Sequence, residues 1–279
     1  ADTNAWEKAS NLNGVLSAIG SSPAAPGVLF IGRSSGTGDI YRLNDAYTSD
    51  FTTTPFNADP FDSLPDAAFL STIYCSSIVV DANDANHVIV TYSNYNLKSI
   101  WESFDALAFE PHWHCIEGDL PDLPVYWSAI HPDYPDVVYI ATELGVFYTD
   151  HVDGYATHWM PCSSFPIVRT DMLRIRVADK KIVAATHGRG LWESFLSGPE
   201  GINNILWRER GPNNIGGRTR TIMIDPNDPT GKTVWAGSVG GGLWKTTNID
   251  GVSIEQPENV ETISLEVFPN PASDYVNLH

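Results

Sequence analysis

The strongest constraint on the fold of this chain is one pattern that occurs five times along its 279 residues. Each copy contains three strand candidates rich in β-branched and aromatic residues. The first two are separated by a turn of Asp, Asn, Pro and Gly, and the third follows a glycine turn. The copies occupy residues 17–45, 77–105, 128–150, 173–195 and 221–248. A recurring pattern of this kind predicts one supersecondary unit stacked several times.

An aromatic residue stands at the same place in the third strand candidate of every copy. These aromatics are Tyr41, Trp101, Phe147, Trp192 and Trp244. They recur at intervals of roughly 45 to 60 residues, and a fourth strand candidate lies between copies, as at 112–116 and 158–162. Four short strands per unit predict an all-β fold, a β-propeller of four-stranded antiparallel blades. A β-sandwich ranks lower, because it would not repeat one pattern five times. We expect the aromatic rings to pack between blades rather than to stack on sugars.

Charge excludes several classes of partner. The chain has 16 Lys and Arg against 34 Asp and Glu, a net charge of −18. Such a chain is repelled by phosphate backbones and anionic lipids, so nucleic acid is an unfavourable partner. No apolar run is long enough for a membrane span, and we expect no membrane insertion. Of the three cysteines, Cys115 and Cys162 occupy similar places in successive copies. They could form a disulfide, although free buried thiols are favoured.

Three stretches resemble a known family of repeats. Residues 131–150 (HPDYPDVVYIATELGVFYTD), 185–194 (ATHGRGLWES) and 211–248 are similar to the blades of sortilin-like and sialidase-type (BNR) propellers from large secreted bacterial proteins. The resemblance covers roughly residues 10–249 and implies the propeller architecture. It does not define the function, because such blades occur in glycosidases, receptors and adhesins alike.

The last residues resemble a second family. Residues 263–279 (ISLEVFPNPASDYVNLH) are similar to the opening of the C-terminal sorting domain of cargo exported by the type IX secretion system. This resemblance implies a protein that is secreted, or held at the outer-membrane surface of a Gram-negative bacterium, with the type IX machinery as a partner. It also implies three parts: a propeller over 1–249, a linker over 250–262 and a partial sorting domain over 263–279.

The loops at one end of the predicted tunnel carry the candidate ligand-binding residues. Propellers usually bind ligands on one face of the ring. This face carries the loops between blades and the turns between the second and third strands of each blade. The candidates on this face are Arg33, Tyr95, Tyr126, Trp127, His187, Arg189 and Arg218, together with Arg220. Two carboxylates, Glu143 and Asp171, are weak catalytic candidates, and a loop-capping role is favoured for both. A sialidase also needs a Tyr/Glu nucleophile pair, and none is recognisable in the sequence.

Metal sites are weakly indicated. His112 and His114 are two residues apart, so on a strand they share a face and could form half of a zinc site, but no third ligand is apparent. Asp150, Asp153 and Asp250 lie in loose versions of the Asp-box turn. They could bind calcium, although such side chains more often hold the turn by accepting backbone hydrogen bonds. We therefore predict no cofactor and no metal, with calcium left open.

The sequence favours a binding protein over an enzyme. The expected ligand is a glycan, a glycoprotein or another surface polymer bound at the tunnel face. The first alternative is the scaffold of a glycoside hydrolase of the sialidase or xyloglucanase type. The second is a structural or motility-associated surface protein whose propeller docks other chains.

Overall fold

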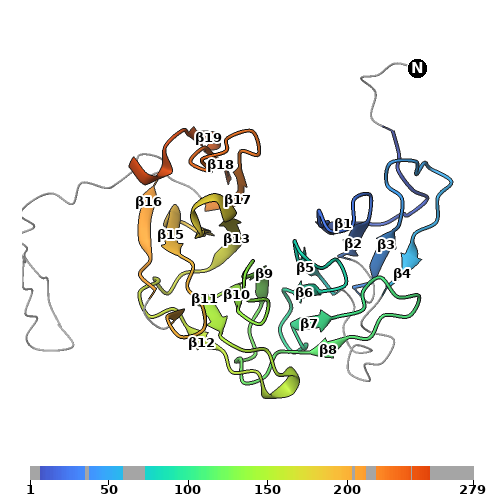
Figure 1. Ribbon diagram of the computed structural model, residues 1–279, viewed down its shortest axis with the longest axis horizontal. Helices are drawn as coiled ribbons and strands as arrows, with labels where there is room; N and C mark the ends of the chain where they lie inside the picture. Colours follow the sequence, from blue (N-terminus) through green and yellow to red (C-terminus); the bar gives the residue numbers. More distant parts are fainter. Residues whose placement is uncertain are drawn as a thin grey trace, which may run out of the picture.

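The computed structural model describes residues 7–34, 38–58, 73–202, 205–211, 218–239 and 241–251. These residues form antiparallel β-sheets and short 3₁₀ turns, and the five sheets surround a central axis as blades (Figure 1). The predicted all-β propeller is confirmed. Residues 252–279, which hold most of the expected linker and the whole expected sorting segment, lie outside the described residues.

Four blades have four strands, and blade 5 has three in the part of the chain that the structure describes. Blade 1 contains β1 (Leu16–Gly20), β2 (Leu29–Arg33), β3 (Ile40–Leu43) and β4 (Phe56–Asn57). Blade 2 contains β5 (Cys75–Val80), β6 (Val88–Tyr92), β7 (Ile100–Ser103) and β8 (His114–Cys115). Blade 3 contains β9 (Val125–Ile130), β10 (Val138–Thr142), β11 (Gly145–Thr149) and β12 (Met160–Pro161). Blade 4 contains β13 (Thr170–Arg176), β14 (Lys181–Thr186), β15 (Leu191–Phe195) and β16 (Arg208–Gly211). Blade 5 contains β17 (Arg218–Ile224), β18 (Val234–Val239) and β19 (Gly242–Thr246).

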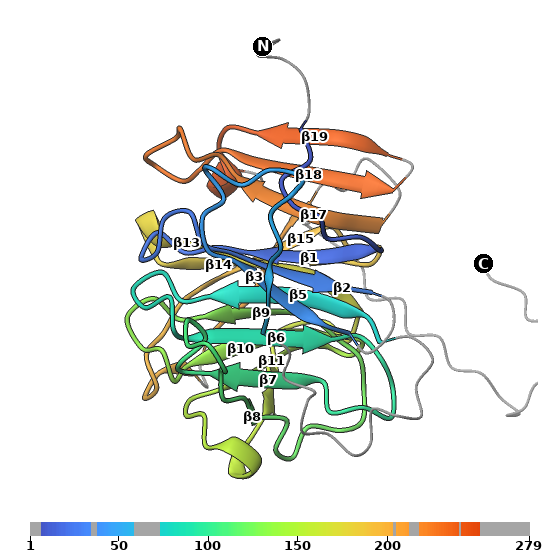
Figure 2. The same ribbon diagram turned by 90° about the vertical axis from the view of Figure 1, so that its right-hand side faces the viewer.

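The first strand of each blade lies nearest the axis and contacts the first strand of the next blade. The contacts run from β1 to β5, from β5 to β9, from β9 to β13 and from β13 to β17. Figure 2 shows β1, β5 and β9 in succession from the side. Between β17 and β1 the arc stays open in the described part of the chain (Figure 1). The described residues also contain the short 3₁₀ elements η3 (Gly154–Ala156), η4 (Val177–Asp179) and η6 (Ile249–Gly251).

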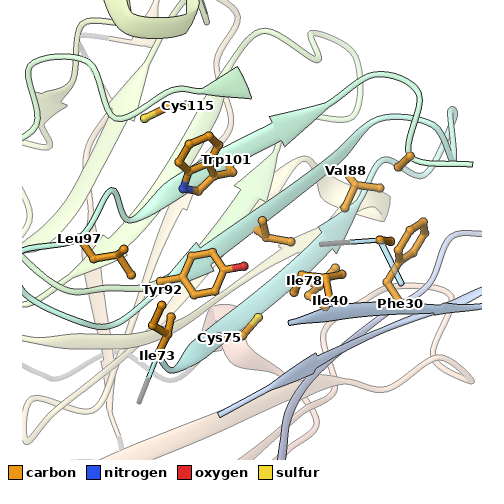
Figure 3. Packing of buried hydrophobic residues seen from close by; sticks show 13 residues of the cluster. Phe30, Ile40, Ile73, Cys75, Ile78, Val88, Tyr92, Leu97, Trp101 and Cys115 are labelled. Atoms are coloured by element: carbon orange, nitrogen blue, oxygen red, sulfur yellow. The ribbon is translucent and has the colours of Figure 1, made fainter. Parts of the chain in front are cut away.

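The core lies between blades, as the interface of blades 1 and 2 illustrates (Figure 3). Phe30 and Ile40 of blade 1 belong there to the same buried cluster as Ile78 and Trp101 of blade 2. Near the axis, blades 1 and 2 approach so closely that only one of two facing residues can have a side chain. A Cβ on Gly32 would lie 2.4 Å from the sulfur of Cys75, so glycine is required at this position.

The repeated aromatics lie on the side of each blade that faces the preceding blade. Trp101 and Phe147 belong to buried clusters between blades. Trp192 is partly buried and contacts Phe165 with ring centroids 5.7 Å apart. Trp244 is more exposed than these three. Tyr41 stands on the open side of blade 1, where it accepts a hydrogen bond from Arg33.

The cysteines form no disulfide. None of Cys75, Cys115 and Cys162 is in a disulfide, and all three are buried, as the favoured alternative expected. Burial raises the pKa of the Cys115 thiol and raises that of Cys162 to about 12. Both thiols therefore stay protonated near neutral pH and act as small apolar core groups.

A buried cluster of charges joins blade 4 to η6 at the end of the molecule opposite the tunnel-face loops. Glu193 stands at its centre, with 3% of its side chain exposed, 3.0 Å from the ammonium of Lys181 and 3.2 Å from the guanidinium of Arg176. Asp250 of η6 accepts hydrogen bonds from Lys181 and Arg176. Arg210 completes the cluster, 3.3 Å from Glu193. We refer to these five residues as the charge cluster.

Because of Asp250, the free energy of unfolding of the protein should depend on pH in the acid range. Burial alone would raise its pKa, but the hydrogen bond from Lys181 and the charges of Lys181 and Arg176 lower it to about 2. A carboxyl with a lowered pKa stabilises the fold above its unfolded pKa of 3.8 and loses that contribution as pH falls toward 2. In urea titrations, wild type should be more stable than Asp250→Asn at pH 7, and the difference should shrink below about pH 4 and vanish only below about pH 2. A difference that stays constant with pH would contradict this assignment.

Candidate binding site at the tunnel face

The central feature of the tunnel face is a β-bulge at the same place in the first strand of every blade. In each blade the register with the second strand shifts by one residue near the start of the first strand. The residues passed over by these shifts are Ser17, Ser76, Tyr126, Asp171 and Arg220. A residue left out of the ladder is free to turn its side chain away from the sheet. We call these five residues the bulge ring.

All five residues of the bulge ring line one cavity of about 450 Å³. The other lining residues are Tyr74, Ser93, Trp127 and Arg169. The five blades thus each contribute a side chain to one pocket, and the pocket lies where propellers commonly bind ligands. Its lining is largely polar, with two arginines, one carboxylate and three aromatic rings.

The two serines of the bulge ring tie neighbouring blades together. The hydroxyl of Ser17 donates to the carbonyl of Cys75 at 2.7 Å, and that of Ser76 donates to the carbonyl of Val125 at 2.6 Å. Each acceptor is the first residue of the next blade's inner strand. In blades 1 and 2 the bulge residue therefore stabilises the contact with the next blade. In blades 3 to 5 the bulge residue has a larger side chain, which lines the pocket.

Tyr126 stands between an arginine and a carboxylate. Its hydroxyl donates a hydrogen bond to Glu143, which follows β10 in the neighbouring turn. The guanidinium of Arg169 lies over its ring, 4.0 Å from the centroid. Burial and the bond to Glu143 raise the pKa of the Tyr126 phenol well above its usual range. No Tyr/Glu pair is recognisable in the sequence, but the structure contains one, because the turn after β10 brings Glu143 to Tyr126.

Asp171 presents one bonded and one free oxygen. Its Oδ1 accepts a hydrogen bond of 2.7 Å from Arg169, whereas its Oδ2 is buried without a hydrogen-bond partner. Only 7% of the side chain is exposed. An unpartnered buried carboxylate oxygen is costly, and a ligand hydroxyl in the pocket would satisfy it. Asp171 is therefore positioned to accept a hydrogen bond from a bound molecule.

Trp127 closes the inner end of the pocket. It lines both this pocket and a second cavity of about 230 Å³ further along the axis. The guanidinium of Arg174 lies 4.9 Å from the centre of its ring. Arg174 also lines the second cavity, and burial lowers its pKa. Trp127 is therefore part of the wall of both cavities, and Arg174 is part of the wall of the second.

The remaining predicted residues of this face lie outside the pocket lining. Arg33 forms an ion pair with Asp39 at 2.9 Å on the open side of blade 1. His187 and Arg189 are exposed in the turn after β14, and Arg218 is the first residue of β17. Tyr95 is also exposed, and it is close enough to raise the pKa of Tyr126. The structure thus brings together Tyr126, Trp127, Glu143, Asp171 and Arg220 from the predicted set.

The pocket lining contains residues that the sequence did not indicate. Arg169 is the central one, because it contacts both Tyr126 and Asp171. Ser17, Ser76 and Tyr74 were also missed. One signal could have located the serines: once the five copies are aligned, they stand at the same position as Tyr126.

The predicted metal ligands are placed as follows. His112 is paired with Asp105 at 2.7 Å, and the described residues contain no group of three His, Cys, Asp or Glu that could hold a metal ion. The carboxylate of Asp250 is paired with Lys181 within the charge cluster. No helix among the described residues has the length and hydrophobicity to cross a membrane.

Comparison with known proteins defines the fold. No protein-family model matches the sequence, and no curated protein matches it. The structure is similar to a GH74 xyloglucanase from Xanthomonas campestris (12% identity, TM-score 0.56, 84% of this chain and 37% of that chain). It is also similar to a GH74 enzyme from Niastella koreensis (12% identity, TM-score 0.59, 85% of this chain and 37% of that chain).

A third similar structure is the extracellular domain of a longer protein. It is the extracellular domain of a protein described as a one component system from B. thetaiotaomicron (15% identity, TM-score 0.54, 84% of this chain and 27% of that chain). The chain spans little more than a third of the length of the two GH74 enzymes and about a quarter of the length of the third structure. At such low identity the likeness establishes the β-propeller fold alone.

Proposed function

We propose that this protein is an extracellular propeller that binds a carbohydrate without cleaving it, in the pocket lined by the bulge ring. The observation that carries the proposal is the buried, unpartnered Oδ2 of Asp171 at the wall of this pocket. A sugar hydroxyl would donate to that oxygen, while Arg169 and Arg220 would donate to sugar oxygens or to a carboxylate. Trp127 offers an apolar ring surface for the C–H face of a sugar ring.

The state of Tyr126 supports binding over catalysis. A tyrosine nucleophile must lose its proton during the reaction, and burial holds the pKa of this phenol above its usual range. The phenol thus remains a hydrogen-bond donor to Glu143. Its ring, covered by Arg169, then serves as a fixed wall of the pocket.

A glycan array of the full chain, followed by calorimetry on the strongest oligosaccharide, tests the proposal. Asp171→Ala and Arg220→Ala should each weaken binding by about ten- to a hundredfold, because each removes a hydrogen bond that involves a charged group. Arg189→Ala is the matched control on the same face, and it should leave affinity within about twofold of wild type. Equal losses in all three variants, or no bound glycan, would contradict the proposal.

A glycoside hydrolase is the second candidate, and one observation favours it. Tyr126 and Glu143 form the hydrogen-bonded pair that a sialidase-type reaction needs, next to Arg169 and with Asp171 as the available acid. Assays on sialyl and β-glucan substrates separate the two functions. Turnover that disappears in Tyr126→Phe would establish the hydrolase and remove the non-catalytic proposal.

The resemblance of residues 263–279 supports a proposal about location. We place the protein outside the cell or on the outer-membrane surface, delivered by the type IX secretion machinery. Fusing residues 250–279 to a reporter in a bacterium with that system, and comparing it with a strain lacking the system, measures the contribution of this segment directly.

A further inference from the structure

A third cavity, which we call the basic cavity, lies at the end of the molecule opposite the bulge ring. Its volume is about 410 Å³, close to that of the pocket at the tunnel face. Four of the five residues of the charge cluster form part of its wall, namely Lys181, Glu193, Arg210 and Asp250. The rest of the wall includes Arg208 and the apolar side chains of Phe195, Leu196, Ile205 and Leu206. The basic cavity therefore combines ionised groups with apolar ones.

Two arginines of β16 line the basic cavity because of the register of that strand. Arg208 is paired with Glu193 of β15, and Arg210 is the residue that the register shift between the two strands passes over. Both arginines are part of the lining, whereas Glu209, which is paired with Trp192, is not. The bulge thus places two guanidinium groups at one wall without the carboxylate that separates them in the sequence.

The positive charge at this wall is only partly neutralised. With its ion-paired neighbours Asp179 and Lys232, the charge cluster contains four cations and three carboxylates. Arg208 is a fifth cation, so five positive charges face three negative ones. This local excess occurs in a chain whose net charge is −18. A concave surface with a positive excess attracts anions and concentrates them.

Both arginines retain hydrogen-bond donors that are not in use. In the part of the chain that the structure describes, the exposed guanidinium of Arg208 forms no ion pair and donates no hydrogen bond. Arg210 donates from Nη1 to the carbonyl of Asp250 at 3.4 Å and from Nη2 to Glu193 at 3.3 Å, but its Nε is buried without a hydrogen-bond partner. A buried donor without an acceptor is unfavourable, and an oxyanion bound beside it would supply the acceptor.

Apolar side chains stand next to these donors. Phe195 is 63% exposed and Leu206 is 66% exposed, and both line the basic cavity. The ammonium of Lys181 lies 5.0 Å from the centre of the Phe195 ring. A ligand with an apolar body would remove these two side chains from water, whereas an inorganic ion would leave them exposed.

We propose that the basic cavity binds an organic oxyanion, a carboxylate or a phosphate or sulfate ester, that carries an apolar body. The oxyanion accepts hydrogen bonds from Arg208 and from Nε of Arg210, and the body lies against Phe195 and Leu206. The planar guanidinium of Arg208 matches two oxygens of such a group. The site is independent of the carbohydrate pocket, because the two cavities share no lining residue.

Calorimetry of the full chain with small probes tests the proposal. Benzoate and phenyl phosphate carry two kinds of oxyanion on the same ring, and benzamide is the neutral counterpart of benzoate. At least one of the two anions should bind with a Kd of about 1 mM or tighter, and benzamide should bind at least about tenfold more weakly than benzoate. The tighter of the two anions identifies the kind of oxyanion that the site prefers.

Arg208→Gln should weaken the binding of that anion by about ten- to a hundredfold, because it removes hydrogen bonds from a charged donor. Arg208→Lys keeps the charge but not the planar fork, and its affinity should lie between those of wild type and Arg208→Gln. Arg189→Gln, at an exposed arginine in the turn after β14, is the matched control and should bind within about twofold of wild type. Urea denaturation should give the same stability for Arg208→Gln and wild type, so that lost affinity is not lost folding.

The ring-free anions acetate and inorganic phosphate test the apolar walls. Each should bind at least about fivefold more weakly than its ring-bearing counterpart, and Phe195→Ala should reduce that difference. Equal affinities with and without the ring would overturn the assignment of an organic ligand. Binding of neither benzoate nor phenyl phosphate, equal binding of benzoate and benzamide, or an Arg208→Gln variant that binds like wild type would overturn the proposal as a whole.

Discussion

Glu193→Gln should lower the free energy of unfolding by about 3–5 kcal/mol, the largest loss we expect from one substitution in this protein. Glu193 is almost fully buried and faces the cations of Lys181, Arg176 and Arg210. Glutamine keeps the volume of the side chain but removes its charge, which leaves three cations with only the partly exposed carboxylates of Asp250 and Asp179. Urea denaturation at pH 7, followed by tryptophan fluorescence, measures the loss.

The chain provides a matched control at the equivalent position of blade 2. Glu102 follows Trp101 as Glu193 follows Trp192, and it is also buried, 2.8 Å from the Nε2 of His87. Burial alone would lower the pKa of His87, but Glu102 and Asp81 raise it. In Glu102→Gln the imidazole can lose its proton, whereas Lys181 and the arginines keep their charges. Glu102→Gln should therefore cost less than Glu193→Gln, and equal costs would show that lost packing rather than charge controls both.

Arg169→Ala should weaken carbohydrate binding by about a hundredfold or more. The side chain covers the ring of Tyr126 and donates to Oδ1 of Asp171. Its removal takes a hydrogen-bond donor from the ligand and leaves Asp171 without its cation. Charged hydrogen bonds of about 1.5–3 kcal/mol and a cation–π contact of about 0.5–2 kcal/mol are involved. Calorimetry with the oligosaccharide selected on the array measures the change.

Arg169→Lys separates charge from geometry at this position. Lysine keeps the positive charge but lacks the planar guanidinium that stacks on Tyr126 and bonds Asp171. We expect an affinity between those of wild type and Arg169→Ala. If lysine restored binding fully, Arg169 would act as a point charge alone, and the role assigned to its stacking would be wrong.

The repeat made the architecture predictable, because strand patterns and turns recur at matching places in every copy. The strands around 112–116 and 158–162 appear as β8 and β12, marked by the tryptophans beside them. The opening between blades 1 and 5 was not predictable. Ile19 and Leu243 look like Ile78 and Leu191 in the sequence, and only the fold shows that the first two are exposed among the described residues while the other two are buried.

The site was predictable in its location but only partly in its members. Tyr126, Trp127 and Asp171 lie at strand starts, where the loops of a propeller converge. Strand propensity does not reveal the bulges, because one extra residue in a short strand changes the apolar pattern too little to be recognised. Arg169 was not predicted, because it lies just before β13 and its role depends on contacts with Tyr126 and Asp171.

The bulge ring also determines how this pocket can change its specificity. A bulge residue is outside the regular strand ladder, so its side chain can be exchanged with little effect on the sheet beneath it. Each blade supplies one such position, and the five positions face one cavity. Ser17 and Ser76 bind the next blade, so the positions open to exchange are those of blades 3 to 5. Different side chains at these three positions would suit different ligands on an unchanged scaffold.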